Sequence, residues 1–182
     1  RPTAPRISER AGVSVRSVFQ HFDDLETLYA AVGSRVTERV AALIEPIDPA
    51  LALPERVVAF FRQRGRVNEG LTRTLRAAVV HAPGSPTINN QFQNGHAFVS
   101  AHLAEVFRPE LDRLGATRDV VLDSLVAVGS WSTWNTVRHL SHRSEAEAER
   151  VVGHLAAAVL GDALGEQLTP RVAELLAEQA PA

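Results

Sequence analysis

Near the start of the chain, several polar side chains have the spacing that places residues on one side of a helix: Arg16, Ser17, Gln20 and His21. The Arg16 guanidinium could donate two parallel hydrogen bonds to O6 and N7 of guanine, or bind a phosphate. Ser17 and Gln20 offer a short and a long hydrogen-bonding group to base edges. Ser14 and His21 are placed to meet phosphates. By themselves these residues fit an ordinary solvated helix face. On a helix built to enter a DNA groove they would instead suit recognition of double-stranded DNA.

Two short helices joined by a tight turn are expected to position these side chains. Ile7 and Ala11 lie four residues apart, so both face one side of a first helix. Gly12 can end that helix with positive φ, and Ser14 can cap the next helix by accepting a bond from a free N–H. This is the helix-turn-helix plan for entering a DNA major groove. The apolar side chains of the second helix that are expected to face inward are Val15, Val18, Phe19 and Phe22.

At these residues the chain resembles the tetracycline-repressor (TetR) family of bacterial transcription regulators. The matching segments are Ile7–Ser14, Val18–Phe22 and Leu25–Tyr29. The resemblance implies an all-α fold with a helix-turn-helix DNA-binding head and connecting helix at residues 1–45. A larger helical domain for ligand binding and dimerisation would follow at residues 46–182. The family carries a further helix before this element, and no segment of this sequence matches it.

The resemblance also implies which residues contact DNA, and the sequence departs from the family at two of the relevant positions. Phe19 stands where the family often has Tyr, whose hydroxyl binds a phosphate. Leu25 stands where a Lys commonly contacts phosphate. We therefore expect weaker non-specific affinity for DNA than is typical of the family. The positions carried over as DNA-contacting are Thr3, Ser14, Val15, Arg16, Ser17, Phe19, Gln20 and His21.

Charge and composition limit the class of protein. The net charge of the 182-residue chain is −2, yet residues 1–22 hold four arginines against Glu9 alone, a local charge of +3. Basic character is thus concentrated on the element expected to bind DNA. The chain has no Cys, which excludes disulfides and thiolate metal sites. A cytoplasmic protein is expected, in keeping with the absence of Cys. No uncharged apolar run approaches the ~20 residues that span a bilayer.

The apolar spacing of the remaining chain predicts helices and no strands, hence an all-α fold. One helix is expected from Leu25 to Leu43, a second from Leu53 that Gly70 interrupts, and a shorter continuation to His81. Further helices are expected over residues 86–107, 117–140, 144–164 and 169–176. Helix caps are expected at Thr3, at Asp23 or Asp24, at Ser85, at Thr117 and at Ser144, which forms a capping box with Glu147.

By resemblance, the larger domain should hold a small-molecule effector among its central helices. Trp131 and Trp134 share a helix face, and Asn135 beside them could supply a polar contact. Few charges accompany these residues, so a largely apolar effector is expected. The alternative is that aromatic residues at helical spacing are ordinary core. The candidate ligand-binding residues are Phe60, Phe61, Phe92, Phe98, Trp131, Trp134 and Asn135.

Small residues are frequent in the segments 117–140 and 144–164, including Gly129, Gly153 and Gly161. In the resembled family the two corresponding helices pair with their copies in a four-helix homodimer interface. A twofold dimer would set two recognition helices ~34 Å apart and predicts a near-palindromic operator. The alternative is that the alanines here are simply good helix formers.

The sequence-based prediction of function is a homodimeric repressor released from its operator by a ligand. No enzyme and no cofactor are expected, because Gly-x-Ser-x-Gly, a phosphate-binding Gly loop and His-Glu-x-x-His are all missing from the sequence. His139 and His142 are three apart, but no acidic or Cys partner at ligand spacing favours a metal. Two alternatives stay open: a helical small-molecule-binding or enzymatic domain with a vestigial helix-turn-helix, and a protein-interaction module.

Overall fold

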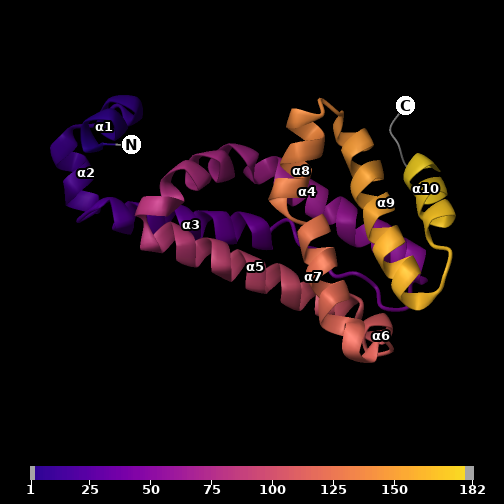
Figure 1. Cartoon of the computed structure of the whole chain (residues 1–182). Helices are drawn as coiled ribbons and strands as arrows, with labels where there is room; N and C mark the ends of the chain where they lie inside the picture. The colour runs from indigo at the N-terminus through magenta and orange to yellow at the C-terminus, as the bar shows by residue number, and fades with distance from the viewer. Residues whose placement is uncertain (1–2, 179–182) are drawn as a thin grey trace.

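A computed structural model describes residues 3–178, and all regular structure in that range is helical (Figure 1). This confirms the predicted all-α fold. None of the helices in this range is both long and apolar enough to cross a membrane. The α-helices are α1 Ala4–Ala11, α2 Val15–His21, α3 Leu25–Ala41, α4 Leu53–His81, α5 Pro86–Val106, α6 Arg108–Leu111, α7 Arg118–Val128, α8 Trp131–Asn135, α9 Glu145–Leu164 and α10 Thr169–Glu178.

Helix α4 is the centre of the fold. Helices α8, α9 and α10 pack along it, while α7 packs against α5 and α9. The two short helices α1 and α2 lie at one end of the molecule, and α3 runs from them towards the other helices beside α5 (Figure 1). The buried hydrophobic core is correspondingly concentrated after residue 56, and Val18 is the one buried hydrophobic residue in 3–52.

Local side-chain caps begin several helices as the sequence predicts. The Ser14 and Asp24 side chains accept from the backbone N–H of the third residue after each, at 3.0 and 2.7 Å. Ser144 forms the capping box with Glu147. Thr3 and Thr117 do not cap through their side chains. Thr117 instead donates its hydroxyl to the Leu114 carbonyl in a 3-10 turn, at 3.0 Å. The first turn after Thr3 includes a proline, which has no N–H to offer a cap.

The predicted interruption at Gly70 is wrong, because α4 is continuous from Leu53 to His81. One glycine in a helix interior costs only ~1 kcal/mol. Its neighbours on either side, Val67 and Leu71, are buried. Burial of these side chains in the core outweighs the conformational freedom of Gly70, so packing keeps the helix intact.

The predicted single helix over 117–140 is also wrong. Helix α7 ends at Val128, α8 begins at Trp131, and a π-helical turn occupies Thr136–Leu140. The break lies where the chain approaches α4 closely. A Cβ on Gly129 would lie 3.4 Å from the Phe61 ring, and the Asn68 amide of α4 donates to the Gly129 carbonyl at 3.2 Å. Ser130 then caps α8 by accepting from the Thr133 N–H at 3.2 Å.

Helix α3 is fastened to the start of α5. The Glu26 carboxylate accepts a hydrogen bond from the Ser85 hydroxyl at 2.9 Å and another from the Thr87 N–H at 3.1 Å. The Gln91 amide donates to the Tyr29 carbonyl at 2.8 Å. At Gly33 the two helices are so close that a Cβ would lie 2.0 Å from the Gln91 side chain. Hydrogen bonds made by side chains thus connect α3, and with it α1 and α2, to the helices from residue 53 onwards.

Several small residues of α9 make contacts within the chain. A Cβ on Gly153 would lie 2.7 Å from Leu176 of α10, and one on Gly161 would lie 2.6 Å from the Glu166 carbonyl. Ala156 and Ala157 are fully buried. These residues let α9 pack closely with α10 and α4, so their small size is explained without a second copy of the chain.

Candidate functional site

The turn between α1 and α2 has the geometry predicted from Gly12. Gly12 adopts a left-handed conformation with φ 67° and ψ 28°, where an L side chain is strained. The Val13 N–H donates to the Ser8 carbonyl at 3.0 Å, which closes the end of α1. The chain then becomes extended at Ser14, whose hydroxyl caps α2. The three-residue connection Gly12–Ser14 therefore sets the orientation of α2 against α1.

The polar row of α2 faces solvent. Arg16, Gln20 and His21 are exposed, and none of the three forms a hydrogen bond or ion pair with another described residue. Ser17 is half-buried, and its N–H is held by Ser14. The exposed Thr3 stands at the start of α1. The side chains predicted to contact DNA are thus gathered at one end of the molecule, and those of Arg16, Gln20 and His21 have no partner among the described residues.

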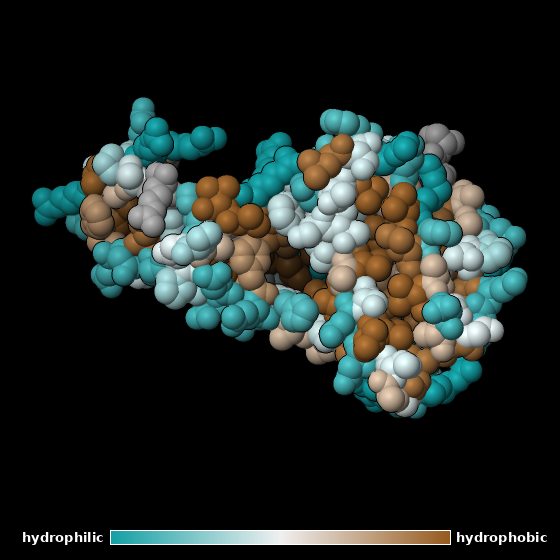
Figure 2. All heavy atoms as spheres, viewed as in Figure 1, coloured by the Kyte–Doolittle hydropathy of each residue, from teal (hydrophilic) through white to brown (hydrophobic). Residues whose placement is uncertain are grey.

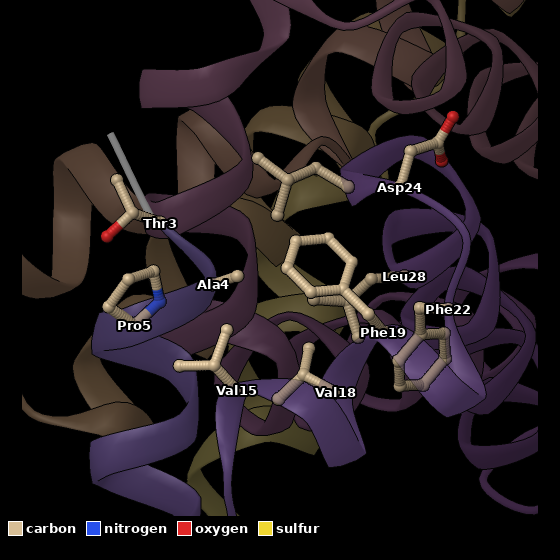
Figure 3. A pocket seen from close by; sticks show the side chains of 10 residues that line it. Thr3, Ala4, Pro5, Val15, Val18, Phe19, Phe22, Asp24 and Leu28 are labelled. Carbon is tan, nitrogen blue, oxygen red and sulfur yellow. The ribbon is translucent and has the colours of Figure 1, made fainter.

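The prediction that Phe19 and Val15 face inward is wrong. Phe19 is 55 % exposed and Val15 is 38 % exposed, whereas Val18 between them is buried. Helix α1 has only eight residues, and it leaves the Val15 and Phe19 side chains incompletely covered. Figure 3 shows Phe19 and Val15 on an open apolar cavity of about 480 Å³ between α1, α2 and α3. The other residues that line it are Thr3, Ala4, Pro5, Val18, Phe22, Asp24, Leu25 and Leu28.

The predicted tryptophan and asparagine cluster is bound to α4. The indole N–H of Trp134 donates to Glu69 at 2.8 Å, and that of Trp131 donates to Thr72 at 3.1 Å. The Asn135 oxygen accepts from Arg76 at 3.1 Å. Trp134 is 1 % exposed, with its ring against Gly65. Both indole N–H groups and the Asn135 side-chain oxygen therefore have partners within the fold.

The predicted phenylalanines divide between core and surface. Phe60 and Phe61 of α4 are fully buried and pack edge to face, with ring centroids 5.2 Å apart. On α5, Phe92 is half-buried and Phe98 is 46 % exposed. The half-buried His102 lies between the two groups, with its ring 5.0 Å from Phe60 and 6.0 Å from Phe98. A line of rings therefore leads from the surface of α5 to the core.

A buried cation stands at the inner end of this line. Arg64 follows Phe60 by one turn of α4 and is 7 % exposed. Its Nη2 donates to the Asn68 side-chain oxygen at 3.3 Å, while its buried Nε has no partner. No carboxylate of the described residues lies within ion-pair distance of it. Burial lowers the pKa of Arg64 to about 10, because a charge removed from water is destabilised.

His102 belongs to the same environment. Burial, followed by the positive charge of Arg64, lowers the pKa of His102, so the imidazole is neutral near pH 7. Its buried Nδ1 has no hydrogen-bond partner. The sequence-based prediction missed Arg64, Asn68 and His102. A signal was present for Arg64 and Asn68, because α4 is apolar on more than one side, so some of the polar side chains between those apolar residues must be buried.

Among the described residues, no group of three His, Asp or Glu side chains could hold a metal ion. Neither a family model, nor a curated protein sequence, nor a solved structure matches this chain. Two features of the molecule itself point to a function. One is the exposed polar row on α2, and the other is the buried polar group around Arg64.

Proposed function

We propose that this protein is a DNA-binding transcriptional regulator, and specifically a repressor that a small-molecule effector releases from its operator. The observation that carries the proposal is the exposed polar row Arg16, Gln20 and His21 on α2, directly after the left-handed turn at Gly12. The side-chain donors of a short helix that follows a tight turn can reach base edges when that helix enters a major groove. The resemblance of residues 7–29 to the TetR family points the same way.

In this proposal each exposed side chain has a separate role at the DNA. Arg16 donates to guanine and Gln20 pairs with adenine, and each bidentate contact discriminates between bases by about 1–3 kcal/mol. His21 and Thr3 meet phosphates and fix the register. Phe19 has no hydroxyl for a phosphate, and its ring lines the cavity between α1, α2 and α3, so no contact with DNA is assigned to it.

The proposal includes a homodimer formed through α7 and α9. These helices pack side by side and carry exposed apolar side chains, with Val120 69 %, Val151 38 % and Leu155 39 % exposed. Figure 2 shows hydrophobic side chains gathered over α9 and its neighbours. A twofold pairing there would present two copies of α2 about one DNA turn, ~34 Å, apart. This dimer does not require the small residues of α9 that pack against α10.

Release by an effector requires coupling between the helical body and α2. The hydrogen bonds of Glu26 with Ser85 and Thr87 join α3 to the start of α5, so a shift of α5 would move the amino-terminal helices. An effector that favours the conformation with wrongly spaced recognition helices would lower affinity for the operator. Coupling of about 1–3 kcal/mol, typical of allosteric proteins, would suffice for a 5- to 150-fold effect.

The test is selection of a binding site from random duplex DNA, followed by footprinting on the selected sequence. We expect a near-palindromic site. Arg16→Ala and Gln20→Ala should each weaken binding by about 1–3 kcal/mol and relax the base preference at one position in each half-site. Arg35→Ala is the matched control, because Arg35 is an exposed arginine on α3 that lies outside the polar row; it should leave base preference unchanged.

If no sequence is selected above non-specific binding, the proposal that this protein is a transcriptional regulator is refuted. If the protein then turned over or bound a small molecule with both variants unaffected, the helical binding or enzymatic domain would be the better description. A protein partner that covers α2 would instead favour the interaction module.

A further inference from the structure

Arg64 is a buried charge for which the described fold supplies no counter-charge. It is 7 % exposed, and within residues 3–178 its one hydrogen bond goes to the Asn68 side-chain oxygen. Its Nε is buried without a partner. A buried, uncompensated charge costs several kcal/mol, and proteins normally pair such groups. An anion bound beside Arg64 would remove that cost.

The groups around Arg64 are arranged to complete an anion site. Asn68 follows one turn later on α4, and its amide nitrogen is already used on the Gly129 carbonyl, so it offers Arg64 only an oxygen. His102 approaches from α5, and its buried Nδ1 has no partner. A neutral imidazole protonated at Nδ1 could donate to an oxygen of the same anion. Both unpartnered nitrogens belong to residues next to Phe60, because the His102 ring lies 5.0 Å from the Phe60 ring and Arg64 follows Phe60 by one turn of α4.

The site has an apolar approach from the surface. Phe98 is 46 % exposed and lies one turn before His102, and His102 in turn contacts the buried Phe60. A molecule with a polar head and an apolar body would therefore meet apolar surface along α5 before reaching Arg64.

We propose that Arg64 and His102 bind the carboxylate of an amphipathic organic acid, whose apolar part extends along α5 towards Phe98. This acid is the effector of the proposed repressor, so its regulatory role rests on the proposed function. The proposal replaces the largely apolar effector expected from the sequence with an acidic one.

A carboxylate fits better than a neutral group or a phosphate. One guanidinium supplies one positive charge, and a monoanion balances it, whereas a phosphate dianion would leave a buried negative charge. His102 adds no charge near pH 7, because burial and Arg64 lower its pKa. The planar guanidinium fork matches the planar carboxylate, which can accept two parallel hydrogen bonds. A neutral ligand would leave the charge of Arg64 uncompensated.

The experiment uses the full chain and isothermal calorimetry with octanoate and phenylacetate, each compared with its neutral amide. Both acids should bind at least about tenfold more tightly than octanamide and phenylacetamide, since the amides lack the charge that strengthens hydrogen bonds to Arg64. Arg64→Met should remove at least about tenfold of the affinity for the acids and leave that for the amides unchanged. Arg66→Met is the matched control, because Arg66 is on the same helix but exposed.

A second readout does not depend on the variants folding. The Nε–H nuclear magnetic resonance signal of Arg64 in the unmodified chain should shift when octanoate is added and stay in place with octanamide. Equal affinity for acid and amide, or full acid affinity in Arg64→Met, would overturn the proposal. So would a lack of saturable binding by both acids at millimolar concentration.

These outcomes are separable from a failure of the proposed function. Calorimetry contains no DNA, so it tests the acid site alone, while footprinting without any acid tests operator binding alone. If both succeed, octanoate or phenylacetate should release the operator from the unmodified protein and fail to release it from Arg64→Met. An acid that binds at Arg64 without affecting operator binding would overturn its role as effector.

Discussion

Arg56 and Arg64 lie eight residues apart on α4 and are buried almost equally, at 6 % and 7 % exposed. Their surroundings differ. Arg56 forms an ion pair with Glu110, and it also donates to the Val106 carbonyl at 2.8 Å and to the Leu51 carbonyl at 3.1 Å. Arg64 has the Asn68 oxygen alone, with no carboxylate of the described chain in reach.

The difference separates two uses of a buried arginine. The fold itself satisfies Arg56, so Arg56 fixes α4 against the end of α5 and against α6. Arg64 is left with a buried charge that opposes folding, and burial lowers its pKa to about 10. Stability does not explain such a residue, because a well-packed apolar side chain of similar volume would do as well or better. A charge held ready for a ligand does explain it.

Loss of the internal counter-charge of Arg56 should have the largest effect. Glu110→Ala leaves the Arg56 guanidinium buried and unpaired, so we expect a loss of about 3–5 kcal/mol in the free energy of unfolding. Urea denaturation measures it. Asp112→Ala, an exposed carboxylate two residues further on, should change stability by no more than about 0.5 kcal/mol. A small effect of Glu110→Ala would mean that Arg56 is no better compensated than Arg64.

Removal of the single partner of Arg64 should cost less. Asn68→Leu removes the oxygen that accepts from Arg64 and the amide that donates to the Gly129 carbonyl, and we expect a loss of about 1–3 kcal/mol. The same urea titration applies. A loss as large as that of Glu110→Ala would show that Asn68 compensates the charge fully, and the contrast between the two arginines would then fail.

Replacement of the arginines themselves should give opposite results. Arg64→Met removes an uncompensated charge while it keeps most of the volume, so stability should change by less than about 1 kcal/mol or increase. Arg56→Met strands the buried Glu110 carboxylate and should cost about 3–5 kcal/mol. Differential scanning calorimetry of the two variants side by side is the measurement. If Arg64→Met and Arg56→Met destabilised the protein equally, the fold would not distinguish a compensated from an uncompensated arginine.

The smallest expected effect concerns acid stability near Arg64. Burial and the Arg64 charge lower the pKa of His102 from 6.5, so the unfolded chain binds a proton at this residue more readily than the folded one. Stability therefore falls as the pH drops from 6.5 through the lower pKa of the folded state. His102→Gln should lose less stability than the unmodified chain between about pH 7 and about pH 5. Parallel loss in both, measured by urea denaturation, would contradict this.

The sequence predicted the amino-terminal helices well because their signals are local. Caps at Ser14 and Asp24 are hydrogen bonds to residues three positions further on, and Gly12 needs no distant partner to adopt positive φ. The polar face of α2 follows from helical periodicity alone. The exposure of Phe19 could not be predicted in this way, because it depends on how far the short α1 extends over α2.

Only the tertiary structure decided where α4 and its neighbours begin, end and become buried. The continuity at Gly70 and the break at Gly129 both depend on packing between segments far apart in the chain. The same holds for the two arginines, which the sequence presents as equivalent positions on one apolar helix. Arg56 meets Glu110 and Arg64 meets no acid because α5 and α6 bring a carboxylate to one turn of α4 and not to the other.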